Sequence, residues 1–370
     1  MSKLVKLTLS GFKSINRLSG LHFGQRNVLI GSNGAGKSNL ISFFRFLSWM
    51  VGPSPGELQF YVSKVGGANS ILHDGAAVTP QVEATLEFET NAGTNEYSAR
   101  LFHAAPDTLI FADERFRFTR REHLQSEWRL LGSGQREAAL VQAAEGGDQT
   151  ARVIRGLLRG CFVYQFHNTS EAARIRQRWD RDENRFLKED GANLAPLLLR
   201  LRDTEPVSYR RILEAVRQVI PFFAEFVLEP LGNTVLLQWR ERGTDVIFSA
   251  HQASDGMLRT LALLTLLLQP LDNLPEVLIL DEPELGLHPF AINVVAGLLK
   301  SVSLHKQVIL ATQSMTLIDY FDAEDIIVVD RPDRESEFRR LDPDQLKEWL
   351  EEYSLAELWE KNVLGGRPGR

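Results

Sequence analysis

The segment Gly31–Ser38, GSNGAGKS, constrains this chain more than any other part of its sequence. The spacing G-x-x-x-x-G-K-S is typical of loops that cradle phosphate groups. Glycines let backbone amides curl around phosphate oxygens, and the N-terminus of the following helix adds a partial positive charge. The segment follows an apolar stretch at 27–30 and precedes a helical pattern over 37–50. The sequence therefore predicts a strand, a phosphate-binding loop and a helix.

Each residue type in this loop has a chemical role. Lys37 has the reach to contact β- and γ-phosphates, and the Ser38 hydroxyl is suited to Mg²⁺. The alternative is a glycine turn with a surface lysine, which the strand before the loop and the helix after it disfavour. We expect ATP and Mg²⁺ as cofactors, held by Asn33, Gly34, Ala35, Gly36, Lys37, Ser38 and Asn39.

An acidic pair lies far along the chain. Four apolar residues at 277–280 predict a buried strand, and Asp281 and Glu282 follow at its carboxyl end, where open α/β sheets place ligands. Asp281 is suited to Mg²⁺, and Glu282 to deprotonating a water that attacks a γ-phosphate. The alternative is a surface turn, since Asp-Glu-Pro ends strands well. We expect Glu284 to be a solvated turn residue rather than a site carboxylate, and His288 to be a helix cap or a subunit contact.

The remaining patterns predict a mixed α/β architecture. Alternating residues predict a strand over 3–10 and an antiparallel meander over 79–131. A connector at 136–160 and a buried strand at 161–166 precede arginine-rich helical patterns through 170–225. After a hairpin near Arg242–Thr244, helices and strands alternate over 255–268, 277–281, 289–300, 307–311, 326–330 and 343–352. This alternation is typical of an α/β fold with a partly parallel sheet.

We predict three lobes within the 370 residues. Residues 1–165 would form an N-terminal lobe with the phosphate loop and an antiparallel β subdomain. Residues 166–230 would form a helical lid, and residues 231–370 a C-terminal lobe with the acidic pair.

Composition narrows the cellular setting. The net charge of −6 neither demands nor excludes nucleic acid, because a local basic surface can hide in the average. The single cysteine, Cys161, permits no intrachain disulfide, which fits a reducing compartment. The longest apolar run, 258–268, is too short to cross a bilayer. We expect a soluble cytoplasmic protein with no membrane partner.

Taken in order, these motifs resemble the ABC-class ATPase heads of the SMC, RecF and OLD-like group. The opening KLTLSGFKSI resembles that group's first strand, and ASDGMLR at 253–259 resembles the ABC signature, normally Leu-Ser-Gly-Gly-Gln. The ending LAELWEKNVLGGRP is similar to that of a compact stand-alone branch of predicted ATPases. The resemblance covers nearly the whole chain and implies a P-loop NTPase fold of ABC type.

The resemblance implies that two heads sandwich two ATP molecules. Each ATP would lie on the phosphate loop of one subunit and on the signature helix of the other. Ser254, Asp255 and Gly256 take the central signature positions, where a hydroxyl, backbone amides and a helix N-terminus suit a γ-phosphate. The alternative is a helix cap over a core helix, and both roles can hold at once.

Three further positions follow from the resemblance. Gln165 is the candidate for the Q-loop residue that contacts Mg²⁺ or water, against a strand-edge polar residue as the alternative. Gln313 takes the switch position, which is usually His; its amide can bond a γ-phosphate or a water but cannot become a cation near neutral pH. Leu285–Leu287 would form the D-loop near a dimer seam.

Partners are the least constrained part of the prediction. The insert between Gln165 and Ser254 is too short for an SMC coiled coil, and no nuclease-like domain follows, so a nuclease or effector would be a separate protein. DNA is expected mainly from the resemblance. Two arginine sets could track its phosphates, with Trp179 stacking on a base, or form solvated faces with internal salt bridges; they are Arg174, Arg178, Arg181 and Arg185 on one helix face, and Arg115, Arg117, Arg120 and Arg121.

These observations favour an ATP-hydrolysing switch of the SMC or RecF type that dimerises on ATP and serves DNA repair, chromosome maintenance or anti-phage defence. Two alternatives stay open: a nucleotide-sensing scaffold with little turnover, supported by Gln313, and the nucleotide-binding subunit of a transporter.

Overall fold

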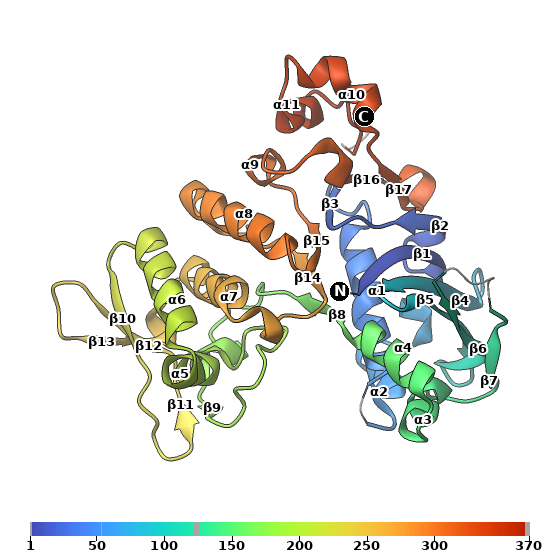
Figure 1. Cartoon of the computed structure of the whole chain (residues 1–370), viewed down its shortest axis with the longest axis horizontal. Helices are drawn as coiled ribbons and strands as arrows, with labels where there is room; N and C mark the ends of the chain where they lie inside the picture. The colour runs from blue at the N-terminus through green and yellow to red at the C-terminus, as the bar shows by residue number, and fades with distance from the viewer. Residues whose placement is uncertain (1, 53, 122–125, 367–370) are drawn as a thin grey trace. The chain divides into compact units, whose positions relative to one another are not determined.

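The computed structural model describes residues 2–52, 54–121 and 126–366. It divides into two compact units, Met1–Phe162 with Asp322–Arg370, and Val163–Phe321. Figure 1 labels their elements. This division groups residues 322–370 with the N-terminal part of the chain. The three lobes expected from the sequence stay a prediction.

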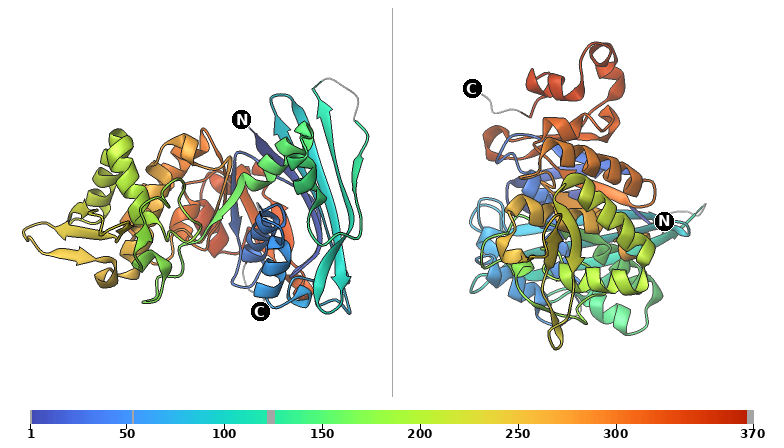
Figure 2. Two further views of the ribbon diagram at one scale, coloured as in Figure 1. Left: turned by 90° about the horizontal axis from the view of Figure 1, so that it is seen from below. Right: turned by 90° about the vertical axis from the view of Figure 1, so that its left-hand side faces the viewer.

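The first unit contains a six-stranded antiparallel sheet of order β2-β1-β4-β5-β6-β7. On β4 every second residue from Val82 to Phe88 is buried, as the two-residue period of a half-buried strand requires. The meander predicted over 79–131 is confirmed for the described residues, and Figure 2 shows its long strands side by side. The strands are β1 (Lys3–Phe12), β2 (Ile15–His22), β4 (Gln81–Thr90), β5 (Gly93–Ala104), β6 (Thr108–Arg120) and β7 (Arg129–Gly132).

A second group of strands in this unit carries the phosphate loop. β16 (Ile326–Asp330) lies parallel to β3 (Arg26–Ile30) and antiparallel to β17 (Glu337–Arg340). Parallel strands have their carboxyl ends at the same edge. The loop that follows β3 and the segment that follows β16 are therefore neighbours.

Helix α1 (Lys37–Met50) supplies much of the core of this unit. Phe43, Phe44 and Phe46 are at most 1% exposed, and the ring of Phe12 meets Phe43 edge-on with centroids 5.6 Å apart. Full burial of each such ring contributes about 1.5–3 kcal/mol. The other helices are α2 (Glu57–Lys64), α3 (Ala139–Glu145), α4 (Gln149–Arg159), α10 (Pro343–Leu350) and α11 (Leu355–Glu360).

In the second unit, a nearly all-apolar helix is surrounded by other helices. α7 (Asp255–Leu268) has Leu258, Leu261 and Leu264 at 0% exposure. It is apolar on most sides because α5, α6 and α8 all pack against it. The other helices are α5 (Leu194–Thr204), α6 (Pro206–Val219), α8 (Pro289–Ser303) and α9 (Met315–Ile318).

The acidic pair lies on a buried parallel strand pair of this unit. β14 (Val277–Asp281) runs parallel to β15 (Gln307–Ala311), and every residue of both strands is buried. Such continuous apolar runs are typical of strands covered on both faces. β8 (Cys161–Tyr164) runs from the first unit into the second.

The predicted hairpin is confirmed as part of a small antiparallel sheet; the remaining strands are β9 (Trp179–Asp180), β10 (Phe223–Val227), β11 (Thr234–Val235), β12 (Gln238–Glu241) and β13 (Ile247–Ser249).

The prediction of a helix through the arginine-rich segment after residue 170 is wrong. The segment holds only a 3₁₀ turn at Arg174–Arg176 and the two residues of β9 before α5 begins. Polar side chains compete for the backbone here: Asp180 accepts from the amide of Asp182, and Asn193 donates to the carbonyls of Glu183 and Phe186. The arginines at 174, 178, 181 and 185 therefore do not share a helix face.

The described residues contain no helix that is both long and apolar enough to span a membrane.

Candidate functional site

The phosphate loop connects β3 to α1 in the first unit, as predicted. Its backbone can only be built with glycine at two positions. A Cβ on Gly31 would lie 2.2 Å from the carbonyl oxygen of Val329, and one on Gly36 would lie 2.0 Å from Oγ of Ser336. Gly36 also has a φ of +116°, which L side chains rarely adopt.

The loop is arranged as a phosphate site requires. Lys37 is buried, and its Nζ donates to the carbonyl oxygens of Gly31 (2.6 Å) and Ser32 (3.0 Å). These bonds hold the ammonium group inside the curl of the loop. The cap of α1 is Gly36, which has no side chain to accept from the first-turn amides. The helix N-terminus thus suits an anion such as a phosphate group.

Residues from outside the motif brace this loop, and no local sequence pattern predicted them. Oγ of Ser336 lies 2.7 Å from Oγ of Ser14 and donates to the carbonyl of Ala35 at 2.6 Å. Nδ2 of Asn39 donates to the same Ser14 oxygen at 2.6 Å, so this side chain also braces the loop, and its contact with the nucleotide stays a prediction. Nη1 of Arg331 donates to the carbonyl of Gly34 at 3.1 Å. The sequence predicted the strand at 326–330 but not its partner. Because this strand lies parallel to β3, the segment that follows it lies beside the phosphate loop.

The predicted metal residues of the second unit contact each other. Nε2 of Gln165 donates to Oδ2 of Asp281 at 2.9 Å, and Nε2 of His167 lies 3.0 Å from the backbone oxygen of Asp281. His167 also contacts Gln165, with its Nδ1 3.0 Å from the amide nitrogen. No group of three or more His, Cys, Asp or Glu able to hold a metal ion occurs among the described residues. The donor set suits Mg²⁺, which binds through one or two carboxylates together with phosphates and water.

Glu282 and Gln313 also meet, as neighbours at the ends of β14 and β15. The side-chain amide of Gln313 donates to Oε1 of Glu282. Glu282 has a φ of +43°, an uncommon value for a residue with a side chain, while its amide donates to the carbonyl of Ala311 at 2.9 Å. Backbone outliers of this kind cluster at functional sites. The two residues predicted as catalytic thus form one hydrogen-bonded pair.

Glu284 is not the solvated turn residue that we predicted. Its Oε1 accepts from Oγ1 of Thr312 at 2.5 Å and from the amide of Gln313 at 3.1 Å. Oε2 is buried without a hydrogen-bond partner in the structure described. Burial raises the pKa of the carboxyl group above its ordinary value, with a smaller contribution from the charge of Glu282. The sequence around Glu284 predicts only a turn. It could not show these buried contacts, because the partners of Glu284 lie on the segment after β15.

A small cavity adjoins the acidic pair. Its volume is about 10 Å³, and its lining includes Phe166, His167, Arg259, Asp281 and Glu282. That volume accommodates about one water molecule. A water there would lie among groups able to orient it.

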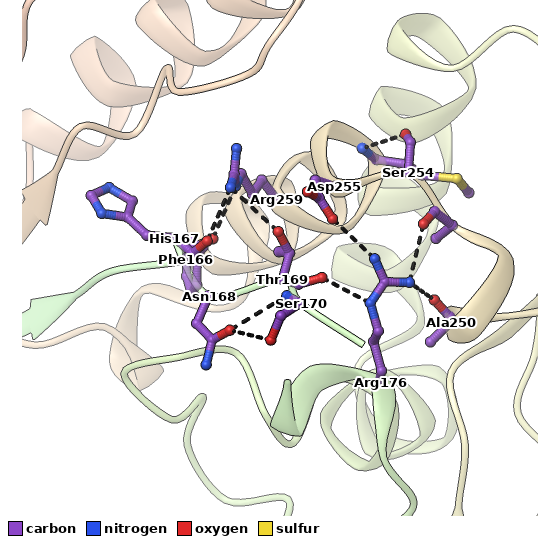
Figure 3. A network of polar contacts seen from close by, with 12 residues as sticks. Phe166, His167, Asn168, Thr169, Ser170, Arg176, Ala250, Ser254, Asp255 and Arg259 are labelled. Carbon is purple, nitrogen blue, oxygen red and sulfur yellow. Dashed lines mark hydrogen bonds and ion pairs between the residues drawn. The ribbon is translucent and has the colours of Figure 1, made fainter. Parts of the chain in front are cut away.

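The signature segment forms the start of α7, and Figure 3 shows its contacts. Oγ of Ser254 accepts from the amide of Met257 at 3.2 Å, so Ser254 is the helix cap. Asp255 does not cap; its Oδ1 pairs with Nη2 of Arg176 at 3.0 Å. A Cβ on Gly256 would lie 2.6 Å from the carbonyl oxygen of Gly286, so glycine permits close packing of the helix start on the 285–287 loop.

Arg259 joins the signature helix to the segment that follows Gln165. Its guanidinium donates to the carbonyls of Phe166 (3.2 Å), His167 (3.0 Å) and Leu285 (3.3 Å). Leu285 itself is 40% exposed. Nδ1 of His288 accepts from the amide of Phe290 at 3.2 Å, which makes His288 the cap of α8.

The second unit thus brings together Gln165 with Asp281 and Glu282 with Gln313, while the phosphate loop belongs to the first unit. Residues 26–319 match the family model described as "AAA domain, putative AbiEii toxin, Type IV TA system". The chain belongs to this AAA-domain family. The match contains the phosphate loop, the acidic pair and Gln313, whereas Ser14, Arg331 and Ser336 lie outside it. Domains of this P-loop ATPase family bind ATP with Mg²⁺.

Solved structures show the same fold. The AAA-domain chain is 18% identical to the head of Smc bound to the C-winged helix domain of ScpA, with a TM-score of 0.60 over 93% of this chain and 99% of that one. For the Smc head with an extended coiled coil bound to the C-terminal domain of ScpA, from Pyrococcus furiosus, identity is 17%, the TM-score 0.54 and coverage 95% and 99%. The Smc head with a coiled coil and joint from Pyrococcus yayanosii gives 14%, 0.54, and 95% and 99%. No curated protein matches the chain. The expected fold, an ABC-type P-loop ATPase with mixed and antiparallel sheets, is confirmed.

Proposed function

We propose that this protein is an ATP-hydrolysing switch whose heads dimerise on ATP. The observation that carries the proposal is the hydrogen-bonded cluster at the ends of β14 and β15, where Gln165 contacts Asp281 and Gln313 contacts Glu282. If Asp281 and Glu282 served only to end a strand at a turn, neither carboxylate would require a glutamine partner. The phosphate loop of the first unit, with Lys37 held inside it, is a second observation that supports ATP binding.

In the proposed reaction, Lys37 and the N-terminus of α1 hold the phosphates, while Ser38 and Asp281 hold Mg²⁺, with Gln165 orienting Asp281. Bound Mg²⁺ supplies charge stabilisation at the phosphate oxygens. Glu282 accepts the proton of the attacking water, and Gln313 orients the Glu282 carboxylate through its amide. Gln313 is neutral, so it contributes a hydrogen bond and not a positive charge.

Two observations support dimerisation: the fold likeness to Smc heads and the signature segment at the start of α7. Ser254, Asp255 and Gly256 begin α7, whose N-terminus suits a phosphate carried by a second copy. The family description names a toxin and a type IV toxin–antitoxin system, and this supports action beside a separate partner or effector protein.

The arginines offer little support for DNA binding, since Arg117, Arg174 and Arg181 each pair with a carboxylate of this chain. DNA binding therefore rests on the fold likeness alone.

The test compares ATP turnover and oligomeric state for the unmodified chain and for Glu282→Gln. We expect Glu282→Gln to abolish turnover and to accumulate an ATP-bound dimer, seen by light scattering after size-exclusion chromatography. Ser254→Arg should bind ATP but stay monomeric. Glu276→Gln is the matched control, because Glu276 lies just before β14 and pairs with Lys306 at 2.6 Å. Unchanged turnover in Glu282→Gln would remove Glu282 from the mechanism.

A further inference from the structure

A buried arginine lies behind the start of the signature helix. The side chain of Arg176 is only 7% exposed, whereas that of its partner Asp255 is 58% exposed. Burying a guanidinium is costly unless its donors are satisfied. The contacts of Arg176 therefore indicate what this position does for the fold.

Three of the four acceptors that the Arg176 guanidinium contacts lie at or just before the start of α7. Nε donates to the carbonyl of Thr169 at 2.9 Å, and Nη1 donates to the carbonyls of Ala253 (3.1 Å) and Ala250. Nη2 pairs with Asp255 at 3.0 Å. Ala253 and Asp255 flank Ser254, so the guanidinium holds both neighbours of the residue that caps α7 (Figure 3).

The charge of Asp255 creates a need for this partner. A carboxylate in the first turn of a helix is favourable for the helix itself. It is unfavourable for a second anion at the same helix end, because like charges repel through a partly dry interface. A positive charge 3.0 Å from Oδ1 offsets that repulsion.

We propose that Arg176 is a positioning residue of the signature segment: it holds the carbonyl of Ala253 and the side chain of Asp255, on either side of Ser254, and neutralises Asp255, so that the start of α7 accepts the triphosphate bound by a second copy of this chain. This inference rests on the proposed ATP-driven dimerisation. If Arg176 had only a structural role, it would hold this segment equally well whether or not residue 255 carried a charge.

The experiment measures ATP affinity and ATP-dependent dimerisation of the full chain in the Glu282→Gln background. Arg176→Gln should weaken dimerisation at least about tenfold while ATP still binds, because the phosphate loop belongs to the other unit. Asp255→Asn should strengthen dimerisation about two- to fivefold, since the repelling charge is gone and the guanidinium remains. Combining both substitutions should recover part of the loss caused by Arg176→Gln.

Arg174→Gln is the matched control, because Arg174 is a 54% exposed arginine two positions away that pairs with Asp190. Normal dimerisation of Arg176→Gln would overturn the inference. So would a double variant as defective as Arg176→Gln, or a loss of dimerisation in Asp255→Asn; this last variant stays informative if Arg176→Gln fails to fold. If the Glu282→Gln parent itself stays monomeric with ATP, the proposed dimerisation fails and this inference fails with it.

Discussion

The side-chain amide of Gln165 donates to Oδ2 of Asp281 over 2.9 Å, although 116 positions separate the two residues. One residue follows β8 and the other ends β14. This pairing is what the proposed Mg²⁺ site depends on in the second unit.

Replacing Gln165 with Ala should therefore weaken Mg²⁺ use. Partners that orient a metal ligand typically contribute ten- to a hundredfold in metal affinity or activity. We expect the Mg²⁺ concentration for half-maximal ATP turnover to rise by about that factor, with a smaller change in maximal rate. A titration of turnover against Mg²⁺ at saturating ATP measures it. An unchanged Mg²⁺ requirement would exclude Gln165 from the metal site.

Replacing Gln313 with Ala should lower kcat while ATP affinity changes little. The amide of Gln313 bonds to Glu282 and its loss leaves that carboxylate free to rotate. We expect a fall in kcat of roughly ten- to a hundredfold, below the 10²–10⁴ that a general base itself contributes. Single-turnover kinetics together with an ATP-binding isotherm separate the two quantities. A normal kcat would show that Gln313 does not contribute to hydrolysis.

Gly36→Ala should weaken ATP binding. The new Cβ would lie 2.0 Å from Oγ of Ser336, at a φ of +116°. Gly56→Ala is a matched control, since Gly56 also has a positive φ, +86°, but a Cβ there would meet nothing within 4 Å. We expect at least about a tenfold loss of ATP affinity for Gly36→Ala, equivalent to about 1.4 kcal/mol, and none for Gly56→Ala. Equal effects would show that backbone strain, and not the clash with Ser336, is responsible.

Glu284→Gln should change how stability depends on pH. Burial raises the pKa of Glu284 above 4.5, so the folded state holds this proton more tightly than the unfolded state does. The stabilisation is complete below pH 4.5 and is lost as the pH rises through the folded pKa. Gln mimics the protonated acid at every pH. The wild-type free energy of unfolding, measured by urea titration, should therefore fall relative to Glu284→Gln as the pH rises; a difference independent of pH would contradict this.

Local patterns predicted the elements that carry the chemistry. Helix Asp255–Leu268 and strand Val277–Asp281 have the bounds expected from their apolar runs and polar flanks. The prediction failed over residues 170–190, where Asp and Asn side chains bond the backbone and defeat an apparent helical spacing. It failed again at Glu284, whose partners come from another strand end.

The sequence by itself determined the phosphate loop and the acidic strand end, because both depend on residues that are adjacent in the chain and on short-range backbone geometry. Only the tertiary structure decided which side chains meet. Ser14 contacts Ser336 across 322 positions and Arg176 contacts Asp255 across 79. Such pairs are set by sheet topology and by the need to satisfy buried polar groups, which no local pattern encodes. The motif alone therefore did not show that Asp255 pairs with a buried arginine.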